Sequence, residues 1–289
     1  VAKQGLIVAD LIERGIVNAI VSTGALMAHG LVEATGRSHF RYNPDVPDTE
    51  LYEQGYNRVY DTLEPEQNLD DVERVMAEVL GNWDHSEVMC SYKLNHAIGG
   101  FLARRSKEQR GILKSAYEKG VPVFVPAFTD SELGLDIALH NRMREGSGRH
   151  KIRFDPFEDL EHFASTLLRQ KRLGIFTIGG GVPRNWSQQF GPFIELRHRR
   201  LGENLPLKRY HYGVRICPEP VYCGLSGSPY SEAISWGKFV PPAEGGRFGE
   251  VFVDATVGLP LIVAAVLERL GKIKSVNGKA KKEKAGARK

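Results

Sequence analysis

The feature that most constrains the fold is a series of continuous apolar runs, rich in β-branched residues, that alternate with helix-like segments. These runs are NAIVST (18–23), VPVFVPAF (121–128), LGIFTIGGG (173–181), GVRIC (213–217) and EVFVDAT (250–256). Because they are apolar at consecutive positions, they predict strands buried on both faces. Their alternation with helices predicts an α/β fold, a doubly wound and mostly parallel sheet with helices on both faces. Residues 37–65, rich in turns and aromatic residues, are expected to leave this sheet.

The length and charge of the chain predict one folded domain and a tail. The chain has 289 residues, 42% of them hydrophobic, which is enough for one large domain or two small ones with a substantial core. Residues 272–289 contain eight Lys or Arg and one Glu, so removing this +7 from the net +4 leaves about −3 for residues 1–271. We therefore expect a single domain over 1–271 and a disordered basic tail over 272–289. A solvated tail is favoured over a nucleic-acid or membrane arm.

Cysteine usage and hydropathy favour a cytoplasmic location. Cys90, Cys217 and Cys223 are odd in number and form no CxxC pair, which is typical of a reducing compartment. The longest apolar run, at 258–267, is too short to span a membrane, and no signal peptide is recognisable. The histidines form no HExxH or paired-ligand pattern, so no metal site is predicted. The chain begins at Val1 within helical periodicity, and we expect it to lack an N-terminal segment.

The ends of the predicted strands carry residues suited to a nucleotide-type cofactor. In an open parallel sheet, ligands bind at the carboxyl ends of the strands. Small or acidic residues stand at four such ends, namely Thr23, Gly24, Asp130, Gly180, Asp254 and Ala255. Each has an ordinary structural alternative, a helix N-cap or a tight turn. Four such ends on one predicted edge favour a cofactor site.

One lysine stands in apolar surroundings, in SEAISWGKF (231–239). A nucleophilic lysine needs its pKa lowered, and the neighbours Trp236 and Phe239 could do this by desolvating Lys238. Taken alone, the stretch favours the alternative, a surface lysine whose stem packs on Trp236. Glu232 could pair with Lys238 or with a cationic substrate, and Trp236 could lie against an alkylammonium group.

Six ordered motifs resemble the deoxyhypusine synthase family. They are VSTG (21–24), PAFTD (126–130), GGGV (179–182), LSG (225–227), SWGK (235–238) and VDAT (253–256). The similarity runs in unbroken order from about residue 5 to 270. It implies a doubly wound α/β domain that binds NAD and assembles as a homotetramer with active sites at dimer interfaces.

The resemblance also implies an alkylamine transfer. In this family, spermidine loses hydride to NAD, the resulting imine is captured by an enzyme lysine, and diaminopropane leaves. The aminobutyl group then passes to an acceptor amine. The acceptor is a protein lysine in deoxyhypusine synthase and putrescine in the related homospermidine synthase. The implied protein is thus a transferase of polyamine metabolism, with a polyamine as substrate.

By position, Lys238 resembles the imine-forming lysine, and Glu232 and Trp236 resemble the polyamine-binding acid and aromatic residue. Thr23, Gly24, Asp130, Gly180, Asp254 and Ala255 fall at or beside the positions that contact NAD in the family. Asn185 replaces a substrate-binding histidine, and Asp136 lies one place beyond a family acid that is here Leu135. We expect both residues to contact the substrate.

Other departures leave the acceptor open. Two family acids after the first strand are here Ala28 and His29, and another is Leu225. This pattern resembles the bacterial deoxyhypusine synthase-like branch. A homospermidine synthase-like enzyme and a non-catalytic homologue that binds polyamine or nucleotide remain the alternatives.

Overall fold

The computed structural model describes residues 4–105, 109–224 and 227–286, without the side chains of Val221 and residues 272–286. The strands are β1 (Ile20–Val21), β2 (Phe40–Arg41), β3 (Tyr56–Val59), β4 (Thr62–Pro65), β5 (Val123–Phe124), β6 (Leu173–Ile178), β7 (Tyr210–Ile216) and β8 (Arg247–Val251). The helices are α1 (Gly5–Glu13), α2 (Gly24–Ala34), α3 (Asp48–Glu53), α4 (Glu66–Gly81), α5 (Ser91–Arg105), α6 (Ile112–Lys119), α7 (Glu132–Gly146), α8 (Pro156–Leu168), α9 (Gly181–Gln188), α10 (Phe190–Leu201), α11 (Tyr230–Ser235) and α12 (Ala255–Gly286), with 3₁₀ turns at Val221–Cys223 and Pro242–Glu244.

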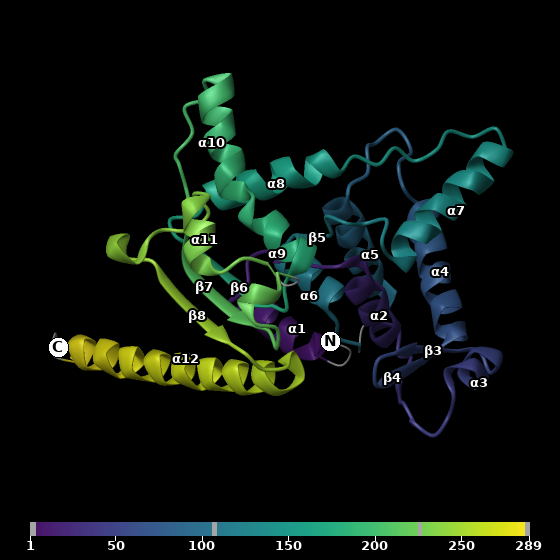
Figure 1. Cartoon of the computed structure of the whole chain (residues 1–289), viewed down its shortest axis with the longest axis horizontal. Helices are drawn as coiled ribbons and strands as arrows, with labels where there is room; N and C mark the ends of the chain where they lie inside the picture. The colour runs from purple at the N-terminus through teal and green to yellow at the C-terminus, as the bar shows by residue number, and fades with distance from the viewer. Residues whose placement is uncertain (1–3, 106–108, 225–226, 287–289) are drawn as a thin grey trace.

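Parallel strands and helices alternate along the chain, and the predicted α/β class is confirmed (Figure 1). Strands β6, β7 and β8 form one parallel sheet, and β1 pairs with β5 in a second, shorter one. Among the described residues no strand pairing joins these two sheets. Their side chains nevertheless share one core, in which Phe124 of β5 packs with Phe163 and Phe190. The predicted sheet is thus present as two adjoining parallel parts.

The predicted excursion at 37–65 forms a small layer of its own. Strands β2, β4 and β3 pair antiparallel in that order, and α3 lies between β2 and β3 in the chain. This layer lies at the foot of α4 in Figure 1. It brings residues of β4 back to α2, which matters for the polar cluster described below.

The helices around β1 and β5 enclose the larger hydrophobic core. Most of its members come from α2, α4, α5, α6 and α7. The packing of α5 on α6 is close, since a Cβ at Gly99 would lie 2.4 Å from the carbonyl oxygen of Leu113. Two of these helices begin at polar caps. Thr23 accepts a hydrogen bond from the Leu26 amide, and Ser131 accepts one from the Gly134 amide.

Helix α12 follows β8 and is assigned as far as Gly286. The segment for which composition predicts a disordered basic tail is therefore helical up to that residue. Its side chains from 272 onwards, and all of 287–289, lie outside the described residues, so the division at residue 271 stays a prediction. None of the helices in the described residues combines the length and the apolar character that a membrane span needs.

Candidate active site around Lys238

Lys238 is held in place by the turn that ends α11. Gly237 adopts a left-handed conformation, with φ of +70°, and the Lys238 amide donates to the carbonyl of Ala233. The Lys238 carbonyl accepts from the Tyr210 amide at 3.0 Å, which ties the segment to the start of β7. The backbone at position 238 is therefore fixed from both sides.

The ammonium group of Lys238 points to α9. Its Nζ donates to Oδ1 of Asn185 at 3.0 Å, and the residue is only 7% exposed. Burial lowers the pKa of Lys238, and the nearby Arg184 cation lowers it further, while Glu232 acts in the opposite direction. A neutral amide faces this lysine where a carboxylate would hold it charged. The surroundings therefore disfavour the charged form of Lys238 and make loss of its proton easier.

Arg184 is a site residue that the sequence did not reveal, because it belongs to no chemical motif. It is buried, and its Nη2 donates to the Ser228 carbonyl at 2.8 Å. Its guanidinium lies 5.8 Å from the centroid of the Tyr230 ring. Burial lowers the pKa of Arg184 as well, so this cation is kept close to Lys238 at an electrostatic cost.

The two other predicted substrate residues of this segment are exposed. Trp236 is 63% exposed, although Lys238 two residues later is buried. Phe239, the other predicted neighbour, is fully buried. Helix α9 contacts the Lys238 ammonium through Asn185, and α10 lies against the Lys238 backbone, where a Cβ at Gly191 would lie 3.6 Å from the Lys238 Cα. Trp236 and the exposed Glu232 remain available to a ligand.

The ends of β1 and β5, two of the four strand ends predicted to form one cofactor edge, lie side by side because these strands pair in parallel. A Cβ at Gly24 would be 2.3 Å from Ser131, so the starts of α2 and α7 meet here only because residue 24 is a glycine. Thr23 caps α2. Asp130 is exposed beside this contact, and the cap of α7 is Ser131 rather than Asp130. The carboxylate of Asp130 is thus not used as the helix cap.

Glycines and an acid also mark the ends of β6 and β8. Gly179 and Gly181 have φ of +80° and +71°, and open space surrounds the place where a side chain would lie on either. Gly180 between them is the N-cap of α9. Asp254 accepts hydrogen bonds from the amide and hydroxyl of Thr256, which lower the pKa of Asp254. Asp254 therefore serves as a cap directly before Ala255, the first residue of α12.

Asp136 lies apart from Lys238, on α7. It is half-buried, and its pKa is raised to about 6 by burial and by the neighbouring carboxylates of Glu73 and Glu132. Within the described part of this chain, no hydrogen bond or ion pair links it to the Lys238 group. The predicted residues Leu225 and Ser226 lie outside the described residues.

Comparison with known proteins identifies the family to which the chain belongs. The sequence model of the deoxyhypusine synthase family matches residues 1–266. The chain belongs to the deoxyhypusine synthase family. Membership places the protein among transferases that move an aminobutyl group. The resemblance carried by the six motifs is thereby confirmed.

Curated relatives come from archaea and bacteria. A protein of Methanosarcina mazei named probable deoxyhypusine synthase 2 is 32% identical over 93% of this chain and 74% of its own length. The deoxyhypusine synthase-like protein of Chlorobaculum parvum is 32% identical over 89% of this chain and 70% of its own length. A crystal structure provisionally assigned as a deoxyhypusine synthase, from Entamoeba histolytica, superposes with a TM-score of 0.56 at 17% identity. The superposition covers 91% of this chain and 69% of the Entamoeba histolytica chain, and it supports the α/β fold.

Proposed function

We propose that the protein is an NAD-dependent aminobutyl transferase that uses spermidine or a related polyamine and forms an imine on Lys238. The observation that carries the proposal is the Lys238 ammonium, buried and hydrogen-bonded at 3.0 Å to the neutral amide of Asn185. A lysine can attack an imine carbon only after losing a proton, and burial beside Arg184 favours that loss.

The strand ends fit the adenine dinucleotide that this chemistry needs. Gly179 and Gly181 leave open space at their Cα atoms, and Asp130 presents an exposed carboxylate suited to ribose hydroxyls. Thr23, Gly24, Gly180, Asp254 and Ala255 would complete the cofactor contacts. NAD bound there would supply the hydride acceptor for the carbon beside the secondary amine of the substrate and, as NADH, the hydride donor for the product imine.

The residues around Lys238 have separable roles in the transfer. The neutral Nζ of Lys238 attacks the substrate imine carbon and forms a new C–N bond. The bond from that carbon to the departing amine then breaks, and diaminopropane leaves with the proton that Nζ has given up. Asn185 Oδ1 accepts a hydrogen bond from Nζ and so orients its lone pair. Glu232 and the exposed ring of Trp236 would receive the ammonium end of the chain. The acceptor amine then displaces Lys238 by the same steps in reverse.

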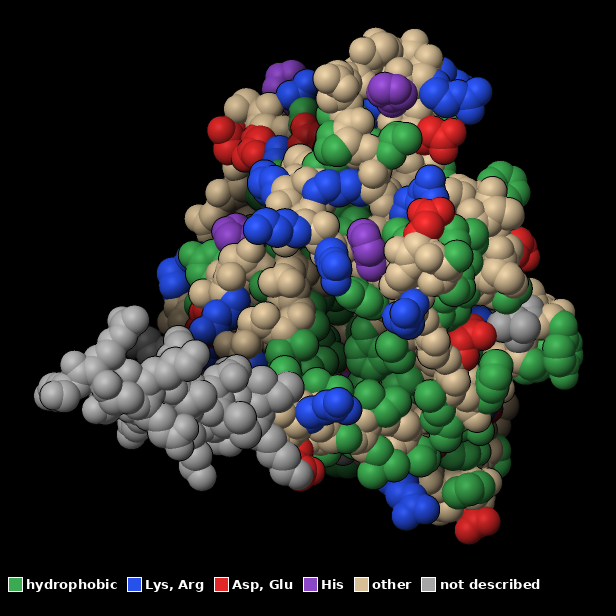
Figure 2. Space-filling view, turned by 90° about the vertical axis from the view of Figure 1, so that its left-hand side faces the viewer, with side chains coloured by type: hydrophobic (Ala, Val, Ile, Leu, Met, Phe, Trp, Pro, Cys, Tyr) green, Lys and Arg blue, Asp and Glu red, His purple; other side chains and the backbone are tan. Residues whose placement is uncertain are grey.

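The site is proposed to be completed by another copy of the chain, in a cytoplasmic homotetramer. Asp136, the acid expected to hold substrate, makes no described contact with Lys238 in its own chain. The β6–β7–β8 sheet exposes Phe176, Tyr212 and Val214 on one face, although parallel sheets are normally covered on both. On the side of the molecule that lies at the left in Figure 1, hydrophobic side chains gather over a broad area (Figure 2). A protomer seated against such a face would bury it.

The direct test is release of diaminopropane from spermidine. Purified protein with NAD and spermidine should release it, and omission of NAD should abolish the release. Lys238→Arg keeps the positive charge but cannot form the imine, so it should bind NAD normally and release none. Release that persists in Lys238→Arg, or no release by a protein that binds NAD and spermidine, would contradict the proposal. The second result would favour the non-catalytic alternative.

The acceptor is proposed to be either a protein lysine or a small amine. The amide of Asn185 and the exposed aliphatic Leu135 stand where the family has polar or acidic substrate contacts, which favours an acceptor other than the usual protein substrate. Adding putrescine and looking for homospermidine separates the two. Formation of homospermidine would establish the small-amine acceptor, and its absence with an active protein would leave a protein lysine.

A further inference from the structure

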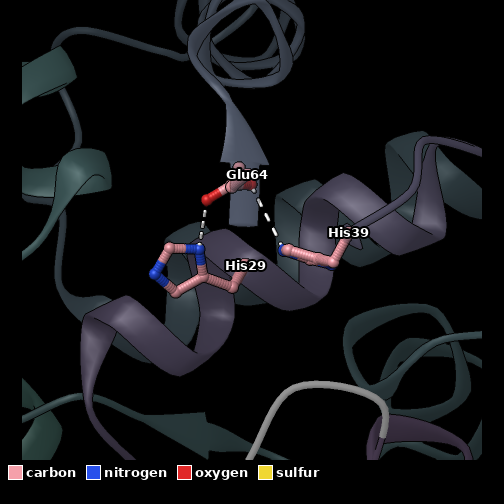
Figure 3. A group of neighbouring side chains, drawn as sticks. All are labelled: His29, His39 and Glu64. Carbon is pink, nitrogen blue, oxygen red and sulfur yellow. Dashed lines mark ion pairs between the residues drawn. The ribbon is translucent and has the colours of Figure 1, made fainter. Parts of the chain in front are cut away.

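A buried cluster of two histidines and a glutamate lies away from Lys238, where the antiparallel layer meets α2. His29 comes from α2, His39 directly precedes β2, and Glu64 comes from β4 (Figure 3). Nδ1 of His29 lies 2.6 Å from Oε2 of Glu64, and Nε2 of His39 lies 3.4 Å from Oε1. One ligand-type atom from each residue lies within 4.8 Å of the others. The three side chains thus converge on one point from three chain segments.

The second ring nitrogen of His39 is also engaged by an acid. Its Nδ1 lies 3.2 Å from Oε1 of Glu33, and the His39 side chain is almost fully enclosed. A carboxylate on one imidazole nitrogen orients the ring and leaves the other nitrogen as a donor to a metal. This carboxylate–histidine pairing is the usual outer support of a metal ligand. Here it directs Nε2 of His39 at Glu64.

The polar atoms at the centre of the cluster are buried and poorly matched as hydrogen bonds. Glu64 has no exposed surface, and neither of its oxygens has a donor aligned for a hydrogen bond within the described residues. Nδ1 of His29 is likewise not aligned with the oxygen 2.6 Å away. Oε2 of Glu132 is a further buried oxygen without an aligned donor, on a carboxylate close enough to act on His29. Both histidine rings pair with Glu64 as ions, and an ion bound between the three side chains would give these buried atoms better-matched partners.

We propose that His29, His39 and Glu64 form a binding site for a divalent transition metal of the zinc class. Two imidazoles and one carboxylate are a known three-ligand set for zinc, and it leaves the fourth position open to water or another ligand. Oxygen-seeking cations such as magnesium and calcium would be disfavoured by the two nitrogen ligands. Tetrahedral coordination needs ligand atoms about 3.3 Å apart. The contact of His29 with Glu64 would therefore widen by about 0.7 Å, and ligand atoms up to 4.8 Å apart would close by up to about 1.5 Å.

Such an ion would join three segments that are separate in the chain. It would fasten β4 and the start of β2 to α2, the helix whose first turn carries Thr23 and Gly24. It would also place a positive charge beside Glu132, next to the carboxylate of Asp136. The expected role is to fix the antiparallel layer against the body of the protein near one part of the candidate site.

The test is metal binding by the full chain, without NAD or polyamine. Protein freed of metal with a chelator is titrated with zinc by calorimetry, and with cobalt while its visible absorption is recorded. We expect one tightly bound zinc and the strong visible bands of tetrahedral cobalt. His29→Asn should remove the cobalt bands and weaken zinc binding about 100-fold or more, and Glu33→Gln should weaken it by about 10- to 100-fold.

His85→Asn is the matched control. His85 stacks on His140 with ring centroids 5.8 Å apart, outside the three-residue cluster. This variant should bind zinc as the wild-type protein does, and zinc should raise the melting temperature of both but not of His29→Asn. The proposal is overturned if the folded wild-type protein binds no stoichiometric zinc, or if His29→Asn and His85→Asn bind it equally. Either result leaves the proposed transfer reaction unaffected, since that is measured separately.

Discussion

At the scale of single residues, the candidate site combines a lysine whose charged form is disfavoured with an aspartate whose charged form is also disfavoured. Lys238 is buried beside Arg184 and faces a neutral amide. Asp136 is half-buried among Glu73 and Glu132. The ammonium groups of a polyamine would stabilise the charged form of Asp136. The disfavoured charge on Lys238 makes its neutral, nucleophilic form easier to reach. Both perturbations therefore suit an alkylamine transfer.

The reactivity of Lys238 should begin at a lower pH than that of an ordinary lysine. Because its pKa is lowered, its neutral fraction rises earlier as pH increases. Competitive acetylation followed by mass spectrometry would give the midpoint for Lys238. In Asn185→Asp, a carboxylate would replace the amide and hold the ammonium, so the midpoint should rise by about one unit or more. Equal midpoints in the two proteins would contradict the role given to Asn185.

Asp136→Asn should stabilise the protein at pH 7.5. The pKa of Asp136 is raised to about 6, above its value in the unfolded chain, so the stability from its protonated form is lost as pH rises through 6. The full shift corresponds to about 3 kcal/mol, and partial exposure reduces the expected gain to about 1 kcal/mol. Urea unfolding at pH 7.5 and pH 4 measures it. The gain should shrink at pH 4, and an equal gain at both would contradict this account.

At the scale of elements, the order of strands and helices was predictable, because continuous apolar runs between helical segments identify buried parallel strands. The partition into β1–β5 and β6–β7–β8 was not, since hydrogen-bond pairing is set by packing and not by local pattern. The sequence left two roles open for Asp130, a cofactor contact or the N-cap of α7. In the structure the N-cap of α7 is Ser131. The cluster of His29, His39 and Glu64 was missed because 35 residues separate its members.

Gly24→Ala should disturb the junction of the two helices that begin at the cofactor edge. The new Cβ would lie 2.3 Å from Ser131, so α2 and α7 must move apart. Overpacking of this kind costs about 1–3 kcal/mol, and NAD binding should weaken with it. Gly30→Ala, in the same helix, is the control, because nothing lies within 4 Å of its Cβ and alanine favours the helix. Thermal melting and NAD titration of both variants give the comparison. Equal behaviour would contradict the predicted contact.

At the scale of the whole molecule, the candidate site residues that the structure describes fall into two groups with no described contact between them. Lys238 and Asn185 lie in the half built on β6–β7–β8, and Asp136 lies in the half built around β1 and β5. The motif resemblance implied active sites at dimer interfaces, and an exposed hydrophobic sheet face is available for one. The sequence alone could not have shown this separation, because motif order does not reveal which groups face each other.

Mixing two inactive variants tests the shared site. Lys238→Ala and Asp136→Ala should each abolish diaminopropane release as pure proteins. If one site takes Lys238 from one copy and Asp136 from another, co-expressed subunits should regain about a quarter of the wild-type rate. Random pairing makes about half of the dimers mixed, and in each mixed dimer one of the two sites is intact. Activity of the mixture no greater than that of the parents would place both residues in one chain's site.

The measurement that tests the central claim most directly is the site of a trapped covalent adduct. Protein incubated with NAD and spermidine is reduced with borohydride, digested and analysed by mass spectrometry. We predict an added aminobutyl group on the peptide carrying Lys238, dependent on NAD and absent in Lys238→Arg. Lys114, which is similarly buried at 8% exposure and whose ammonium donates to the Gln109 carbonyl, should remain unmodified in the same digest. Absence of an adduct in protein that binds NAD, or equal modification of Lys114, would contradict the assignment of Lys238 as the imine-forming residue.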